Sequence, residues 1–148
     1  MIRLPDIVHY RINIGCDEGE VRLVGGSNNN EGRVEICTSG QWGTVCDDSW
    51  DKPDATVVCR QLGFSDAGSV STSSANFGMG IGPISLNRVQ CNGTETRLAN
   101  CSSGSVASCI HSRDAGVRCL VRTGMYMCKH NSRLAYVLAQ IHYNHRWL

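Results

Sequence analysis

The chain has 148 residues, of which 41% are hydrophobic, and its formal net charge is +1. This length supports one compact domain with some additional chain and excludes two full domains. The small net charge gives no electrostatic reason to expect nucleic acid as a partner, and no apolar run is long enough to cross a membrane. Nine cysteines indicate an oxidising compartment, where disulfides reinforce a small core.

Composition changes at two borders. Residues 16–122 hold nine Lys or Arg against twelve Asp or Glu (9 − 12 = −3), together with fourteen of the sixteen glycines. We therefore divide the chain into an N-terminal flank (1–15), a domain (16–122) and a C-terminal tail (123–148). The tail predicts a short amphipathic helix, because apolar residues recur at helical spacing in it: Leu134, Val137, Leu138 and Ile141.

The compartment of the chain follows from its cysteines and its first residues. The flank has no apolar core of a signal peptide. The cysteines still favour a secreted or cell-surface location, so we expect this sequence to be a piece of a longer secreted protein or receptor. Zinc is the competing use of cysteine, and the lack of any Cys-x-x-Cys pair disfavours it.

The first elements of the domain read as strands. Residues 20–26 and 32–37 alternate between apolar and polar side chains on either side of a turn-rich segment, which predicts an antiparallel pair. Residues 41–46 follow the turn at Ser39 and Gly40 and predict a third strand.

The next segment, residues 51–64, has helical character. Pro53 suits the first turn, Val58 and Leu62 fall on one face, and Gly63 is a natural stop. The acidic residue before the proline, Asp51, predicts the N-cap.

The remaining elements are shorter. Residues 64–83 are rich in Gly and Ser and predict a loop with room for one short strand. Residues 84–91 predict a strand, 94–101 one or two helical turns begun by Thr94, and 115–121 a closing strand. The order of elements is therefore that of an α+β domain.

Asp47 and Asp48 follow Cys46 and lie between Trp42 and Trp50, and three roles compete for them. Catalysis is disfavoured, because no nucleophile with a nearby base and no Gly-x-Ser-x-Gly elbow occurs in the chain; we expect no enzyme activity. Clustered carboxylates suit calcium, and they also suit a turn in which they accept backbone hydrogen bonds. The tryptophans predict packing residues, and His111 predicts a structural or surface residue.

Seven motifs follow one another in the order of a known family. From about Val21 to Cys119 the chain is similar to scavenger receptor cysteine-rich (SRCR) domains. The motifs are VRLVGG, GRVEIC, WGTVCDDSW, VVCRQLGF, GMGIGPISL, VQCNGTE and DAGVRC.

This resemblance implies a curved antiparallel β-sheet of five to six strands that cradles one α-helix. It also implies three disulfides: Cys46 to Cys109, Cys59 to Cys119 and Cys91 to Cys101. Phe64 stands where the eight-cysteine branch has a cysteine, so the domain resembles the six-cysteine branch. Cys16 and Cys37 are then additional, and we predict that they bond to each other, which leaves Cys128 without an assigned partner.

The resemblance also implies a calcium site. Its ligands would be Asp47 and Asp48 with Glu95, and Asn87 would offer a further oxygen. A second site in some relatives would use Asp48 with two more positions, here Asp51 and Asn92. For Asp51 the helix cap is the favoured role.

The implied function is extracellular ligand binding. Members of the family bind proteins, polyanions or glycans, and microbial surfaces, often with calcium. We expect contact with a membrane only through other parts of a larger protein. Twelve of the fourteen cationic residues are Arg, which suits sulfate, phosphate and carboxylate. The predicted ligand-binding set is Arg88, Arg97, Arg113 and Arg118.

Two further expectations concern modification and context. Asn92 and Asn100 begin N-glycosylation sequons. The alternative function is a non-catalytic accessory domain of a secreted protease or oxidase, which is also a setting of this family.

Overall fold

The structure is a computed structural model that describes residues 15–121. The predicted tail helix and Cys128 lie outside the described residues. None of the helices in the described part is long and apolar enough to cross a membrane. The elements are β1 (Val21–Gly25), β2 (Glu31–Thr38), β3 (Gln41–Val45), α1 (Lys52–Gln61), β4 (Ser65–Thr72), β5 (Ile84–Gln90), η1 (Leu98–Asn100), β6 (Ser102–Gly104), η2 (His111–Arg113) and β7 (Gly116–Leu120).

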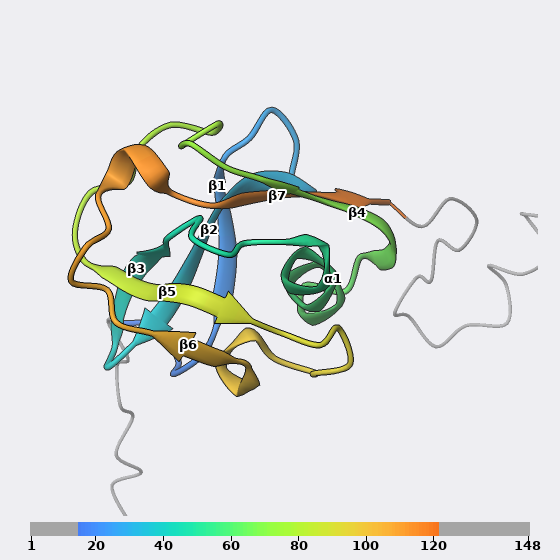
Figure 1. Ribbon diagram of the computed structural model, residues 1–148. Helices are drawn as coiled ribbons and strands as arrows, with labels where there is room; N and C mark the ends of the chain where they lie inside the picture. Colours follow the sequence, from blue (N-terminus) through green and yellow to red (C-terminus); the bar gives the residue numbers. More distant parts are fainter. Residues whose placement is uncertain (1–14, 122–148) are drawn as a thin grey trace, which may run out of the picture.

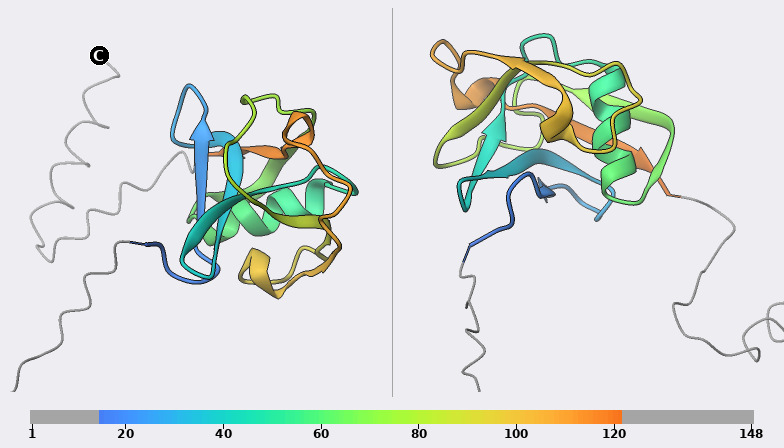
Figure 2. Two further views of the ribbon diagram at one scale, coloured as in Figure 1. Left: turned by 90° about the vertical axis from the view of Figure 1, so that its left-hand side faces the viewer. Right: turned by 90° about the horizontal axis from the view of Figure 1, so that it is seen from below.

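The strands form one curled sheet around α1. Their order is β4, β7, β2, β3, β5, β6, and β1 pairs with β2 outside this path. In Figure 1, β4 and β7 pass on one side of the helix and β5 on the other, and both views of Figure 2 show the strands curving around α1. The predicted α+β fold with a curved sheet and one helix is confirmed.

Two details of the sheet differ from the expectation. The sheet is mixed, because β3 and β5 pair in parallel, with Thr44 opposite Ile84 and Val45 opposite Leu86. A parallel pair needs a long crossover connection, and here the crossover contains α1 and β4. The sheet has seven strands, of which β6 has three residues.

The strand β4 occupies the first part of residues 64–83, for which the sequence predicted a loop with room for one short strand. Ser69 is 3% exposed and Val70 is 50% exposed, which reverses the usual alternation of apolar inside and polar outside. The Ser69 hydroxyl instead lies 2.8 Å from the Thr56 hydroxyl of α1. A polar contact therefore holds this strand against the helix.

The core fills the space between the sheet and α1. The helix buries its apolar face, including Ala55, Val57 and Val58, against apolar residues of the strands. Trp50 belongs to this core, and its indole Nε1 donates a hydrogen bond to the Gly116 carbonyl at 3.0 Å. Its predicted packing role is confirmed. Trp42 is half-buried in β3, and the Arg22 guanidinium lies 4.2 Å from its ring centroid.

Four disulfides connect elements that are distant in sequence. Cys59 of α1 bonds to Cys119 of β7, and Cys46 after β3 bonds to Cys109 before η2. Cys91 and Cys101 close the segment between β5 and β6. The last pair joins Cys16 to Cys37. These are the four pairs that the sequence analysis expected, including the additional bridge.

Candidate functional site

Asp47 and Asp48 lie in a turn directly after β3. The turn is held from two sides, because Cys46 N–H donates to the Leu86 carbonyl at 2.8 Å and Asp47 N–H donates to the Arg113 carbonyl at 2.8 Å. Trp50 N–H closes the turn on the Asp47 carbonyl at 3.1 Å. β3, β5 and the end of η2 therefore fix where the two carboxylates point.

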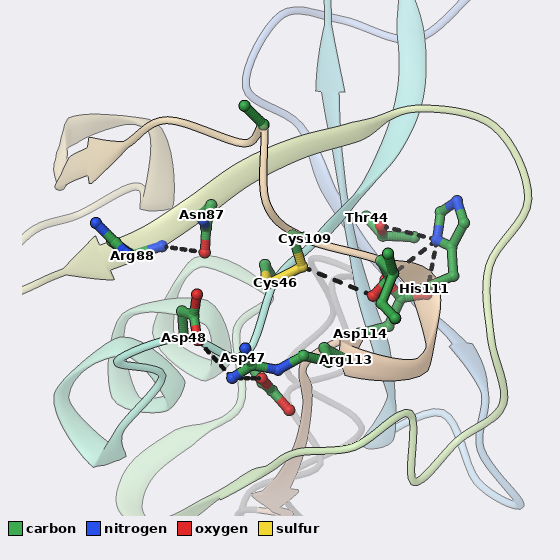
Figure 3. The surroundings of a disulfide bond; sticks show 12 residues. Thr44, Cys46, Asp47, Asp48, Asn87, Arg88, Cys109, His111, Arg113 and Asp114 are labelled. Atoms are coloured by element: carbon green, nitrogen blue, oxygen red, sulfur yellow. Dashed lines mark hydrogen bonds and ion pairs between the residues drawn. A yellow bond between two sulfur atoms is a disulfide. The ribbon is translucent and has the colours of Figure 1, made fainter.

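Arg113 contacts both carboxylates (Figure 3). Its Nη2 lies 2.9 Å from Asp47 Oδ1 and also pairs with Asp48 Oδ1. The other oxygen of Asp47, Oδ2, accepts a hydrogen bond from Ser74 N–H at 2.7 Å. The Asp47 charge, together with Asp48, raises the pKa of Arg113 above its ordinary value. The acidic pair is thus neutralised in part by a cation of the same chain.

Glu95 lies in a different local structure. Its carboxylate accepts hydrogen bonds from Asn92 N–H at 2.9 Å and Gly93 N–H at 3.0 Å. Those backbone donors, Asn92 first, lower the pKa of Glu95. Glu95 therefore stabilises its own turn next to the Cys91 to Cys101 disulfide.

Asn87 and the predicted second site are also engaged elsewhere. Asn87 is fully buried, its Oδ1 accepts from Arg88 N–H at 2.8 Å, and its Nδ2 donates to the Ser105 carbonyl at 2.7 Å. Asn92 Oδ1 accepts from Thr94 N–H at 2.8 Å. Asp51 accepts from Asp54 N–H at the helix N-terminus. In each of these three side chains an oxygen accepts a hydrogen bond from a nearby backbone N–H.

The predicted calcium ligands do not fit a calcium ion in this arrangement. Calcium needs about six to eight oxygen ligands, whereas Arg113 holds both aspartates and Glu95 faces its own backbone. Within residues 15–121, the one group of three acidic, Cys or His ligand atoms that lie within 4.8 Å of one another is Cys91, Glu95 and Cys101. Its two sulfurs are bonded to each other and cannot act as thiolate ligands. Calcium binding stays a prediction of the sequence.

Asp51 caps α1, as predicted. Its side chain accepts from Asp54 N–H, and Asp54 Oδ2 accepts from Asp51 N–H at 2.9 Å, so the two residues form a capping box. Asp54 is fully buried, and its Oδ1 accepts from Cys91 N–H at 2.8 Å. The cap therefore also connects the helix to the end of β5.

We expect Asp51→Ala to lower the free energy of unfolding by about 1 kcal/mol, because one helix N–H loses its partner. Asp51→Ser keeps a capping oxygen and is the matched control, with a loss of about 0.5 kcal/mol or less. Urea denaturation followed by circular dichroism measures both variants. Equal losses in the two would contradict a capping role.

The four arginines predicted to bind ligand contact different parts of the domain. Arg97 donates to the Glu18 carbonyl at 2.8 Å, and Arg113 holds Asp47 and Asp48. Arg118 pairs with Glu31 at 3.1 Å and lies over the Phe77 ring. Arg88 lies on β5 beside Gly104 of β6. Three of the four arginines thus form ion pairs or donate hydrogen bonds to neighbours within the domain.

The contacts that fix the loop between β4 and β5 could not be predicted from the sequence. Asp114 is 1% exposed, and its carboxylate accepts from Gly80 N–H at 2.7 Å and contacts His111 Nδ1 at 3.1 Å. The other ring nitrogen of His111, Nε2, lies 2.9 Å from the Gly82 carbonyl. A side chain at position 80 would meet Thr44 at 2.4 Å, so only glycine allows this approach. The predicted structural role of His111 agrees with these contacts (Figure 3).

This fixed loop carries exposed apolar side chains. Ile81 is 93% exposed and Met79 is 64% exposed, while Ile110, directly before His111, is 63% exposed. The loop and η2 lie side by side in Figures 1 and 2. We call Met79, Ile81 and Ile110 the apolar loop surface. Single exposed apolar residues are common, but several in one region of a fixed backbone are typical of a binding site.

The two predicted glycosylation sites are accessible. Asn92 and Asn100 are both exposed. Asn92 bonds to Thr94 of its own sequon, and Asn100 precedes the disulfide-bonded Cys101. Occupancy of either site stays a prediction.

Comparisons with known proteins agree with this fold and its disulfides. The model of the scavenger receptor cysteine-rich domain matches residues 24–120. The galectin-3-binding protein of Pongo abelii is 54% identical to this chain, in a match that covers 74% of this chain and 19% of that protein. The lysyl oxidase homolog 2 of Rattus norvegicus is also 54% identical, in a match that covers 67% of this chain and 13% of that protein. The crystal structure of the third SRCR domain of murine neurotrypsin superposes with a TM-score of 0.64 at 47% identity, covering 68% of this chain and 94% of that one. The chain thus spans less than a quarter of the length of these curated relatives. From the family match and these identities, the chain belongs to the scavenger receptor cysteine-rich family.

Proposed function

We propose that this chain is a non-catalytic recognition module of a secreted or cell-surface protein and that it binds a protein ligand through the apolar loop surface. The observation that carries the proposal is the exposure of Met79, Ile81 and Ile110 on a backbone fixed by His111 and Asp114. A preorganised loop loses little conformational entropy on binding. Apolar side chains on such a loop supply the anchors of a protein interface.

Two further observations support a protein ligand. One relative is named for binding a protein, galectin-3, and its matching part is 54% identical to this chain. Three of the arginines that would bind a polyanion, Arg97, Arg113 and Arg118, contact neighbours in the domain. Polyanionic, glycan and microbial-surface ligands are the class that competes with the proposed protein ligand. Calcium assistance has no part in this proposal, because Arg113 holds Asp47 and Asp48.

The test uses the full chain with its disulfides formed and an array of purified extracellular protein domains that includes galectin-3. We expect binding to at least one protein, and we expect Ile81→Asp to weaken it about tenfold or more, as for an interface anchor. Val121→Asp is the matched control, because Val121 is also exposed but follows the end of β7, whereas Ile110 and η2 precede that strand.

Heparin is the probe for the competing class. Two results together would overturn the proposal. The chain would bind heparin with an affinity that falls in salt and in Arg88→Ala, and Ile81→Asp would leave protein binding unchanged. Salt dependence identifies an interaction between exposed charges.

The accessory role in a larger enzyme is the second candidate, and the identity to lysyl oxidase homolog 2 favours it. The two functions are distinguished by what the module binds. An accessory domain is expected to bind the catalytic domain or the substrate of its own protein, which the same array tests when these are included as probes.

A further inference from the structure

We propose that Arg113 is a built-in cation that takes the place of the calcium ion expected at Asp47 and Asp48, so that this pair binds calcium only when Arg113 is removed. This role of Arg113 is to neutralise the two carboxylates, and it is distinct from the recognition role proposed above. It is carried by the contacts of one guanidinium with two neighbouring carboxylates.

The first step is the need for a cation. The Asp47 side chain is 5% exposed, and its Oδ1 is buried and has no hydrogen bond besides its ion-pair contact with Arg113. Removing a carboxylate from water is costly unless an opposite charge compensates it. Asp48 places a second negative charge on the next residue, and like charges repel each other. The site therefore requires positive charge.

The second step is that Arg113 supplies that charge at the right point. A single nitrogen, Nη2, contacts Asp47 Oδ1 at 2.9 Å and also Asp48 Oδ1. It lies between the two carboxylates, where an ion bridging them would have to bind (Figure 3). A calcium ion at this point would meet the guanidinium as a like charge and would have to displace it.

The third step is that Arg113 is tethered to the site. Its carbonyl accepts from Asp47 N–H at 2.8 Å, and its own N–H donates to the Ile110 carbonyl at 2.9 Å. The residue whose side chain neutralises the turn is thus also bonded to the turn through its backbone. A tethered group competes at a high effective concentration, whereas extracellular calcium sites have dissociation constants of about 0.1–1 mM. We therefore expect calcium to lose this competition.

The experiment measures thermal unfolding of the full chain in EDTA and in about 5 mM CaCl2, a concentration above those dissociation constants. We expect the midpoint of the wild type to change by less than about 1 °C. Arg113→Glu replaces the cation by a third carboxylate, so its midpoint is expected to fall in EDTA and to rise by about 5 °C or more in calcium. Titration calorimetry with CaCl2 is expected to show binding heat in this variant and none in the wild type.

Two further variants make the result decisive. Arg118→Glu is the matched control: it also reverses a half-exposed arginine that pairs with a carboxylate, and we expect no calcium response from it. Arg113→Gln carries the test if Arg113→Glu does not fold, and it is expected to gain a smaller calcium response. Wild-type binding heat that disappears in Asp48→Asn would overturn the proposal, and so would folded Arg113 variants that do not respond to calcium.

Discussion

Replacing Glu35 by alanine is expected to lower the free energy of unfolding by about 3–5 kcal/mol, because it leaves a buried guanidinium without its counter-ion. Glu35 lies in β2 and is buried. Its Oε1 accepts from Arg33 Nη2 at 2.8 Å, and its Oε2 accepts from Arg22 Nη2 at 2.6 Å. The Arg33 side chain is 10% exposed, so water cannot replace the lost carboxylate without opening the structure.

Arg22→Ala is the matched control for this prediction. Arg22 also pairs with Glu35, but its side chain is 46% exposed. We expect a loss of about 1 kcal/mol or less, as for a surface ion pair. Chemical denaturation of both variants gives the comparison. A loss in Glu35→Ala as small as that in Arg22→Ala would mean that Arg33 finds water or another partner.

The same carboxylate gives a pH dependence. Burial acts to raise the pKa of Glu35, but hydrogen bonds from Arg33 and Arg22 outweigh it and hold the pKa below the ordinary value of 4.5. A lowered pKa in the folded state stabilises the fold above pH 4.5, and this contribution is lost as the pH falls through the lowered pKa. Glu35→Gln is expected to remove that part of the acid destabilisation, which denaturation between about pH 3 and pH 6 measures.

The second large effect is expected from removing the Cys59 to Cys119 disulfide. The bond closes a loop of 60 residues, which corresponds to about 4 kcal/mol in the chain-entropy model. Both sulfurs are buried in the core between α1 and β7, so alanine at both positions also leaves a cavity, which adds to the loss. The total is comparable with the whole stability of a small domain, and we expect the double variant to be largely unfolded at 37 °C.

Cys16→Ala with Cys37→Ala is the comparison for this disulfide. Its loop has 21 residues, which corresponds to about 3 kcal/mol, and its bond joins β2 to the start of the domain outside the main core cluster. We expect this variant to remain folded, with a lower midpoint in urea. A less stable Cys16/Cys37 variant than Cys59/Cys119 variant would contradict this explanation. It would show that the entropy of the unfolded chain and the core cavity do not determine how much each disulfide contributes to the free energy of unfolding.

Much of this fold could be predicted from local patterns. Alternation of apolar and polar residues located β1 and β2. Pro53 indicated the first turn of α1, and Gly63 indicated its end. The position of β4 within residues 64–83 could not be predicted, because Ser69 points inward and Val70 outward. The disulfide pairing came from the family resemblance, since eight cysteines allow 105 arrangements.

The candidate site was harder to predict than the fold. Asp47, Asp48 and Asp51 look equivalent in the sequence, but their roles depend on which backbone groups and cations the fold places beside them. Asp51 had a local signal, the proline two residues later. Arg113 is distant in sequence from the aspartates that it neutralises, so only the folded chain reveals the contact.

The loop between β4 and β5 is held through main-chain atoms, Gly80 N–H on Asp114 and the Gly82 carbonyl on His111. The side chains of Met79 and Ile81 take no part in that attachment and are exposed. The shape of the loop and the chemistry that it presents are therefore specified by different residues. With the recognition role that we propose, substitutions at positions 79 and 81 are expected to change what the module binds while the backbone keeps its course. These two positions are therefore the ones to randomise in a library that seeks new ligands for this scaffold.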